Sequence, residues 1–258
     1  MEKIIKYAPH KFEAYGEEEI QAVVDCLRTG WLTEYGGTRV KEFEEKIAKK
    51  FGKKYGVFVN SGSSANMLAL ACLKLPKNSE VITPACTFST TLAPIIQLGL
   101  KPVFVDVGLN TYVPHFWDVV EAITPNTKAI IIPNLIGNKP NWSGIKQLLK
   151  AKGREDIILI EDSADTITFT DESDISTTSF YASHIITAGG SGGMVMFNNK
   201  KLRDIALQFR DWGRMGDNSE LISDRFNHNV DGIPYDHKFL YDVLGYNFKS
   251  SEMNAAFG

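Results

Sequence analysis

The chain has 258 residues, 43% hydrophobic and 23% charged, a composition typical of a soluble globular protein with one large or two small domains. Its formal charge of −3 argues against nucleic acid or an anionic membrane as a partner, and no apolar run reaches the ~20 residues of a membrane span. The N-terminus lacks a signal-peptide pattern, and the scattered cysteines predict neither a disulfide framework nor a metal site, so we expect a cytoplasmic protein.

Apolar spacing predicts helices over 17–29 and 39–50, each followed closely by a glycine that would end it. Strand-like runs then alternate with stretches long enough for crossover helices, and most runs are continuously apolar, as in strands buried on both faces. This alternation predicts an α/β protein with a doubly wound or related parallel sheet. The expected strands are 55–59, 80–83, 102–107, 128–133 and 156–161, and the expected helices are 63–74, 88–98, 116–124 and 142–152.

Two further segments carry local signals. The β-prone run 179–181 leads through His184 into a turn with four glycines. A lone histidine at a strand end is more often a satisfied core or surface residue than a catalyst. The last residues, SSEMNAAFG, are typical of the opening of a helix, with Ser250 or Ser251 as N-cap. A domain rarely stops there, so we expect a fragment of a longer protein.

Ligands of parallel α/β sheets bind at the carboxyl ends of the strands, so we expect the binding site in the loops that follow the expected strands. NSGSSAN (60–66) would place a glycine and serines at a helix N-terminus, where free N–H groups and the helix dipole favour an anion such as phosphate. A simple N-cap at Ser61 or Ser63 explains the pattern equally well. The loop lacks the Walker lysine and the full GxGxxG pattern, so neither nucleotide-binding interpretation gains support.

Two more strand ends carry candidate residues. In TPACTFSTT (83–91), Phe88 is placed to lie over a flat group, although an aromatic residue there is more often part of the core. In LIEDSAD (159–165), Glu161 and Asp162 end a buried strand, where a charge needs a cationic partner or a cofactor N–H unless Asp162 is an N-cap. A phosphate cradle, a ring stacker, a buried acid and a polar residue near a glycine loop describe a holder for pyridoxal phosphate.

Nine segments follow one another over nearly the whole chain: GWLT (30–33), VKEFEEKIAKKFG (40–52), NSGSSANMLAL (60–70), VITPACTFSTT (81–91), KPVFVDV (101–107), EDSAD (161–165), SFYASH (179–184), GGMV (192–195) and GYNFKSSEMNAAFG (245–258). This order resembles the DegT/StrS sugar aminotransferases, which act on nucleotide-linked keto sugars. The resemblance implies the large domain of a fold type I pyridoxal-phosphate enzyme: α/β, three-layer, with a mostly parallel central sheet and without the small C-terminal domain. It implies an N-terminal helical segment at 1–30, a cofactor-binding core at 31–250 and the start of a truncated helix at 251–258.

The resemblance also assigns residues to pyridoxal or pyridoxamine 5′-phosphate. Serines would bind the phosphate, an aromatic ring would stack on the cofactor, and a carboxylate would pair with the pyridine nitrogen. One contact would come from the second subunit of a homodimer with a shared active site. The residues are Ser63, Ser64 and Ser179 for the phosphate, Phe88 for the ring, Asp162 for the nitrogen, Asn247 from the second subunit, and Gly62 and Asp165 as further cofactor-binding positions.

The aminotransferase pattern S-F-x-x-x-K has a lysine five residues after the serine, and this chain has His184 there. That exchange resembles the nucleotide-sugar 3-dehydratases. Imidazole cannot form the imine that tethers the cofactor, but it is a competent base near neutral pH. The resemblance therefore implies a pyridoxamine phosphate held without a covalent bond. His184 would take a proton from its methylene carbon while the C3 hydroxyl of a nucleotide-4-keto-6-deoxyhexose leaves.

Two branches of these dehydratases differ in what supplies the electrons for the reaction. One uses a cysteine-bound iron–sulfur cluster just after the RDWGR segment (210–214), but the following stretch 215–229 has no cysteine, so we expect no iron–sulfur cluster. The other regenerates its cofactor with an amino acid such as glutamate, which we expect to be the amino donor here. Ser191 stands where an acidic residue is frequent in the family, which affects the expected substrate contacts of the glycine loop.

Two alternative functions stay open on the sequence alone. A sugar aminotransferase could use another lysine or none, and Lys238 and Lys249 do not lie at the expected strand end. A truncated chain could keep the cofactor scaffold as a non-catalytic remnant. His237 could be a second polar group near the sugar or a histidine in a surface loop.

Overall fold

A computed structural model of the chain describes residues 15–33, 37–215 and 225–258. The first half of the predicted segment 1–30 and most of the stretch 215–229 therefore lie outside the described residues. Within the described ranges, no helix has the length and apolar character needed to span a membrane.

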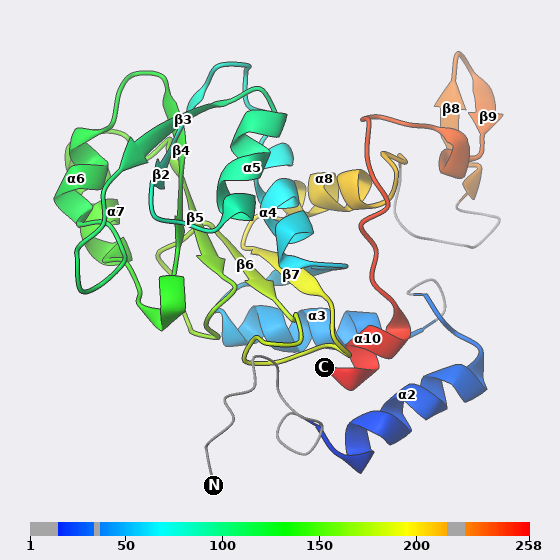
Figure 1. Cartoon of the computed structure of the whole chain (residues 1–258). Coiled ribbons are helices and arrows are strands. Elements are labelled where there is room, and N and C mark those ends of the chain that lie inside the picture. Colours follow the sequence, from blue (N-terminus) through cyan, green and yellow to red (C-terminus); the bar gives the residue numbers. More distant parts are fainter. Residues whose placement is uncertain (1–14, 34–36, 216–224) are drawn as a thin grey trace, which may run out of the picture.

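The predicted alternation of strands and helices is confirmed, with boundaries that differ by a few residues (Figure 1). The strands are β1 (Tyr55–Val59), β2 (Glu80–Pro84), β3 (Lys101–Val105), β4 (Thr127–Pro133), β5 (Ile158–Ser163), β6 (Ile175–Ser179) and β7 (Gly193–Phe197), with a separate hairpin of β8 (His228–Val230) and β9 (Ile233–Tyr235). The helices are α2 (Glu17–Thr29), α3 (Arg39–Lys50), α4 (Gly62–Ala71), α5 (Ser89–Gln97), α6 (Phe116–Glu121), α7 (Trp142–Ala151), α8 (Lys200–Arg210) and α10 (Glu252–Phe257), with short 3-10 helices η1 (Leu135–Gly137) and η2 (His237–Phe239).

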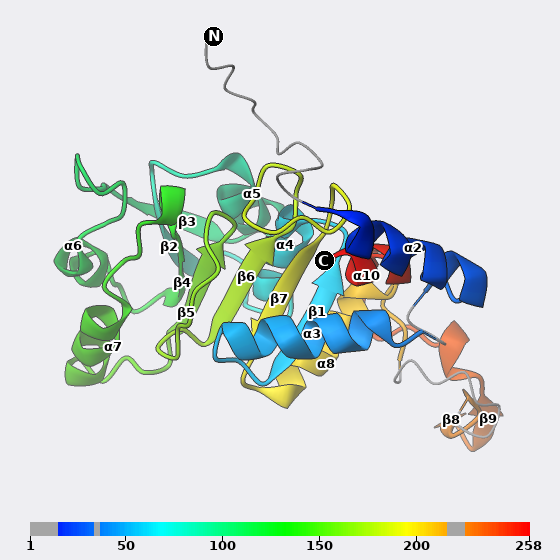
Figure 2. The ribbon, with the colours of Figure 1, turned by 90° about the horizontal axis from the view of Figure 1, so that it is seen from below.

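The central sheet has seven strands in the order β1-β7-β6-β5-β4-β2-β3. Strand β7 runs antiparallel to both of its neighbours, and every other pair in this sheet is parallel. Figure 2 shows the strands side by side in this order, with α3 lying over β1 and β7. The prediction of a mostly parallel sheet is thus confirmed, and the carboxyl ends of the parallel strands share one edge.

Side chains alternate between the two faces of each strand, so successive residues pack into different layers. In β1, Val57 belongs to the cluster under α4, α5 and α8, whereas Phe58 belongs to the cluster under α3. In β4, Ile131 faces the first of these layers, while Ile130 and Ile132 face α6 and α7. Helices therefore cover both faces of the sheet, which explains the continuous apolar runs of these strands.

Strand β6 differs from the prediction. The sequence indicated a strand over 179–181, but β6 ends at Ser179, and Tyr181 lies beyond it with an exposed side chain. The strand itself is the polar run ISTTS, which is fully buried. Its hydroxyl groups find partners inside the protein: Thr177 Oγ1 donates to Asn66 Oδ1 at 2.6 Å, and Thr178 Oγ1 donates to the Ser163 carbonyl at 2.9 Å. Hydroxyl groups with hydrogen-bond partners can be buried at little cost. Because the residues of this strand are polar, the sequence pattern did not indicate a buried strand.

The C-terminal helix α10 packs against α2 and α3, and its Asn254 donates a hydrogen bond to the Ala188 carbonyl in the loop between β6 and β7. Of the two serines that the sequence offered as N-cap, Ser251 takes this position and accepts a hydrogen bond from Asn254 N at 3.1 Å. The buried Glu252 carboxylate accepts hydrogen bonds from Arg39 N at 2.7 Å and Val40 N at 3.1 Å. It thereby pairs two N–H groups that α3 cannot pair within itself, at the positive end of the helix dipole.

We expect Glu252→Ala to lower the free energy of unfolding by about 1–3 kcal/mol, because it leaves backbone N–H groups of α3 without acceptors. Urea denaturation followed by circular dichroism measures the change. Glu45→Ala, on the exposed side of α3, is the control and should change the free energy by less than about 0.5 kcal/mol. A Glu252→Ala loss no larger than that of the control would contradict this capping role.

Candidate active site

A cavity of about 370 Å³ lies at the edge of the sheet where the parallel strands end. Its walls come from the segments that follow β1, β2, β4, β5 and β6, which the parallel arrangement brings to one place. The lining residues are Ser61, Gly62, Ser63, Asn66, Phe88, Thr90, Thr91, Pro133, Asn134, Leu135, Asp162, Ala164, Asp165, Ser179, Tyr181, Ser183 and His184.

The cavity brings together most of the residues that the sequence singled out, and their roles stay predictions. Ser64 and Asn247 do not line it. Ser64 is buried in the first turn of α4, where its Oγ donates to Asn60 Oδ1 at 2.6 Å. Asn247 is exposed and lies on the segment that forms a β-bridge with Asp211. The residues that do line the cavity are Gly62, Ser63, Phe88, Asp162, Asp165, Ser179 and His184.

Asp162 is the last residue but one of β5, and 5% of its surface is exposed. Its Oδ2 accepts hydrogen bonds from Asn66 Nδ2 and Thr91 Oγ1, both at 2.8 Å, whereas Oδ1 has one longer contact, with Ala164 N at 3.3 Å. Burial raises the pKa of Asp162, and the described lining residues include no lysine or arginine that would oppose this effect. The side chain is therefore a buried acceptor with an oxygen suited to a cationic N–H of a ligand.

The sequence did not identify the two partners of Asp162. Asn66 lies on α4, and its Oδ1 is occupied by the Thr177 hydroxyl, so its Nδ2 is the atom presented to Asp162. Thr91 lies in the first turn of α5 and is fully buried. The available signal was a polar residue inside an apolar helix, because Asn66 is flanked by Ala65 and Met67. Only the fold shows that both side chains converge on Asp162.

The start of α4 packs so closely against β6 and β7 that only glycine fits. A Cβ on Gly62 would lie 2.7 Å from Ser179 Cβ, and one on Gly193 would lie 2.3 Å from the Ser61 backbone carbonyl. Ser61 is the N-cap of α4 and accepts a hydrogen bond from Ser64 N at 3.1 Å. The first N–H groups of a helix have no acceptor within it, so this end of the cavity wall suits an anion. The loop thus combines the N-cap with a candidate anion site.

Phe88 is not a core residue, although such a position is more often core. It precedes α5 with 67% of its surface exposed, and it lines the cavity. Tyr181, from the loop after β6, is also exposed and lines the same cavity. The two rings make part of the wall apolar and flat, which suits a planar ligand.

His184 lies in the loop between β6 and β7, where its backbone N–H donates to the Tyr181 carbonyl at 3.0 Å. Its Nε2 is 3.9 Å from Asp165 Oδ1, and its Nδ1 is buried without a hydrogen-bond partner in the described part of the chain. Asp165 Oδ2 accepts a hydrogen bond from Ile136 N at 2.9 Å. The cavity therefore contains an imidazole next to a carboxylate that the chain holds in place.

Glu161 points away from Asp162, because neighbouring residues of a strand face opposite sides of the sheet. Its Oε1 accepts hydrogen bonds from Asn134 Nδ2 at 2.8 Å and Thr170 Oγ1 at 2.9 Å, and Lys139 Nζ lies 4.0 Å away. The charge thus has its own polar partners, and Glu161 does not line the cavity. Only one carboxylate of this adjacent pair faces the candidate site.

The side chains on which the alternative functions depend do not line this cavity. Lys249 Nζ is 3.0 Å from Asp211 Oδ2, and neither Lys249 nor Lys238 lines the cavity. His237 is buried, with its ring centroid 5.8 Å from that of His228, so its interpretation as a surface-loop histidine is wrong. It does not line the cavity either.

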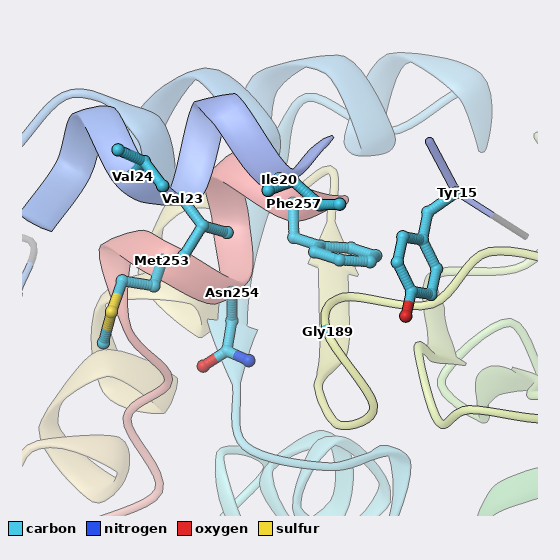
Figure 3. A pocket seen from close by; sticks show the side chains of 8 residues that line it. All are labelled: Tyr15, Ile20, Val23, Val24, Gly189, Met253, Asn254 and Phe257. Atoms are coloured by element: carbon cyan, nitrogen blue, oxygen red, sulfur yellow. The ribbon is translucent and has the colours of Figure 1, made fainter. Parts of the chain in front are cut away.

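A second cavity, of about 530 Å³, lies between α2, α10 and the loop at Gly189 (Figure 3). Its walls are mostly apolar, and Tyr15 is the one ionisable side chain among the described residues that line it. Asn254 Nδ2 donates to the Ala188 carbonyl at 2.7 Å, which ties α10 to the loop that carries His184. This region supports the candidate site and offers little chemistry of its own.

Comparison with known proteins finds relatives along the whole chain. It is 38% identical over 271 residues to the lipopolysaccharide biosynthesis protein RfbH of Salmonella typhimurium, covering 97% of this chain and 61% of that protein. It is 34% identical over 268 residues to GDP-4-keto-6-deoxy-D-mannose 3-dehydratase of Escherichia coli, covering 97% and 66%. A solved structure of that E. coli enzyme with bound hydrated PLP matches with a TM-score of 0.83 and 32% identity, covering 98% of this chain and 66% of the other.

These matches confirm the fold that the sequence predicted. The chain spans 61% to 66% of the length of these relatives. Residues 13–258 match the sequence pattern of a family of aminotransferases, which is nearly all of the chain. The chain therefore belongs to the DegT/DnrJ/EryC1/StrS aminotransferase family.

Proposed function

We propose that this chain is the cofactor-binding part of an enzyme that removes the 3-hydroxyl group of a nucleotide-linked 4-keto-6-deoxyhexose. Its cofactor would be pyridoxamine 5′-phosphate, interconverting with pyridoxal 5′-phosphate. The supporting observation is a cavity that holds His184 and the buried Asp162 and, among its described lining residues, no lysine. Relatives named as 3-dehydratases support the sugar class, and RfbH supports a place in polysaccharide biosynthesis. We assign cofactor binding to residues 31–250.

The lining residues fit such a cofactor. Asp162 Oδ1 would accept the ring N–H, because its present contact is long and burial disfavours its charge without a cationic partner. Phe88 would cover the ring, and Ser63, Ser179 and the start of α4 would hold the phosphate. When bound, this cofactor supplies an electron sink that stabilises negative charge on the carbon attached to its amine.

His184 would move the proton of the reaction. Its Nε2 would take a proton from the C4′ carbon, and Asp162 would keep the ring nitrogen protonated. An imidazole cannot hold the cofactor covalently, so Asp162, Phe88 and the phosphate contacts would carry all of the binding. An amino acid such as glutamate would restore the amine after each turnover.

We also propose a homodimer with a shared active site. Asn247 is exposed and does not line the cavity of its own chain, which suits a residue that reaches a second copy. The same segment exposes the apolar side chains of Tyr241, Leu244 and Tyr246. Apolar side chains that gather on a surface often mark a protein–protein interface.

The reaction is tested by incubating the protein with pyridoxamine phosphate, glutamate and a panel of nucleotide-4-keto-6-deoxyhexoses. We expect a sugar that lacks its 3-hydroxyl group, identified by mass spectrometry and NMR, and formed only when the cofactor is present. The assay is run on this chain and on the full product of its gene. An amino sugar would instead support the aminotransferase, and unchanged sugars in both assays would contradict an enzymatic role.

A further inference from the structure

A second ionisable group lies beside His184. The Nε2 atom of His184 is 3.9 Å from Oδ1 of Asp165, and both residues line the cavity. This separation is longer than a hydrogen bond, but opposite charges at this distance attract each other appreciably where water is partly excluded. The two side chains are 25% and 35% exposed, so solvent weakens this attraction without removing it.

The turn after β4 fixes the Asp165 carboxylate. Its Oδ2 accepts a hydrogen bond from Ile136 N at 2.9 Å, which leaves Oδ1 on the side of His184. Ile136 has a φ of 50°, a left-handed conformation that is costly for a β-branched residue. Such strain persists only where the surrounding structure enforces it, and here it directs the N–H toward Asp165.

The surroundings of His184 leave one of its two ring nitrogens accessible from the cavity. Nδ1 is buried and has no hydrogen-bond partner among the described residues, so Nε2 is the nitrogen with access to the cavity. The other ionisable groups of the cavity wall are Asp162 and Tyr181, and the ring centroid of Tyr181 is 6.0 Å from that of His184. Asp165 is thus the charged group placed to act on Nε2.

We propose that Asp165 is a positioning residue for His184 and not a contact of the cofactor. Its carboxylate holds Nε2 toward the cavity and stabilises the imidazolium that forms when Nε2 takes up a proton. In the proposed reaction the amine of the cofactor would first condense with the 4-ketone of the sugar, releasing water. The proton would then leave the C4′ carbon for Nε2, and the electron pair of that C–H bond would pass to the sugar, whose 3-hydroxyl would take up a proton and leave as water. These steps rest on the proposed function, whereas the pairing of the two side chains does not.

The pairing is tested first in the ligand-free protein. NMR relaxation of the imidazole Cε1–H group of His184 measures the mobility of the ring, and its signal is assigned with the His184→Asn variant. We expect Asp165→Asn to raise the mobility of the ring, because the imidazole loses the carboxylate that lies 3.9 Å from its Nε2. The amide oxygen of the introduced asparagine can still accept the Ile136 N–H, so the turn is kept. Asp165→Glu should restore part of the ordering of the ring, and Asp118→Asn, at an exposed site in α6, should leave its mobility unchanged.

The second readout is the rate of solvent exchange of the C4′ protons of bound pyridoxamine phosphate. We expect Asp165→Asn to lower this rate by about tenfold, with cofactor affinity changed by less than about threefold. An unchanged ring mobility together with weakened cofactor binding would overturn the proposal and make Asp165 a cofactor contact. A raised ring mobility in Asp165→Asn, in a protein whose wild type shows no exchange, would support the pairing and contradict the proposed function.

Discussion

Asparagine in place of His184 is expected to slow the exchange of C4′ protons of bound pyridoxamine phosphate by about 10²–10⁴-fold. The reason is that His184 Nε2 is the basic imidazole nitrogen with access to the cavity, and asparagine cannot take up a proton at neutral pH. The backbone bond from residue 184 to the Tyr181 carbonyl is kept, so the loop should hold its shape. Cofactor affinity should change by less than about threefold, because Asp162, Phe88 and the phosphate site are untouched.

The matched control is His115→Asn. His115 caps α6 at an exposed site, where its side chain accepts the Trp117 N–H at 3.4 Å, and asparagine is a good N-cap. This variant should exchange C4′ protons at the wild-type rate. If His184→Asn also keeps the wild-type rate, then His184 is not the base, and another group must move the proton.

Asp162→Asn should weaken cofactor binding and stabilise the ligand-free protein. It should weaken the binding of pyridoxamine phosphate by about 10–100-fold, because a hydrogen bond to a charged group contributes about 1.5–3 kcal/mol and asparagine cannot pair with a cationic ring N–H as a carboxylate does. It should also stabilise the ligand-free protein at neutral pH, because burial raises the pKa of Asp162 and its ionised form is therefore disfavoured in the folded state. Equilibrium titration of cofactor fluorescence measures the affinity.

The stabilisation of the ligand-free protein by Asp162→Asn should depend on pH. Below the unfolded-state pKa of about 3.9, the carboxyl group is neutral in both states and costs no stability. As the pH rises, the unfolded chain loses its proton first, because the folded-state pKa is higher, and the cost grows until the pH passes that folded-state value. The stability gain of Asp162→Asn should therefore be absent near pH 3 and complete above the raised pKa.

Urea denaturation of the ligand-free variants at several pH values measures this dependence, with Asp118→Asn as the exposed control. The control should show no comparable gain at any pH. A loss of stability in Asp162→Asn at neutral pH would show that the folded ligand-free protein stabilises the Asp162 carboxylate, and the buried acid would then have a structural role.

The apolar strands were the predictable part of the fold. β1 occupies the expected residues 55–59, and β4 begins one residue before the expected 128–133, because buried parallel strands are continuous apolar runs. The sequence placed β6 too late, since its hydroxyl-rich run ISTTS becomes compatible with burial only when partners such as Asn66 are in place. No sequence pattern indicated that β7 runs antiparallel between β1 and β6, which depends on long-range pairing.

The site was predictable where a residue lies at the carboxyl end of a parallel strand or in the loop after it. Asp162, Phe88 and His184 line one cavity because the carboxyl ends of their strands share an edge of the sheet. Ser64 was harder to place, because a hydroxyl in the first turn of a helix can face a ligand or the helix cap, and here it bonds to Asn60. Thr91 could not be found from the sequence, since its contact with Asp162 spans 71 residues of chain.

Borohydride reduction with an equimolar amount of pyridoxal phosphate, followed by intact-mass measurement, tests directly whether this protein holds its cofactor without a covalent bond. The wild-type chain should bind the cofactor and keep its polypeptide mass, because the described cavity wall contains no lysine, whereas His184→Lys should gain the mass of one reduced cofactor. Cofactor trapped at a single lysine of the wild-type chain would contradict the assignment of His184 as a base in an untethered site.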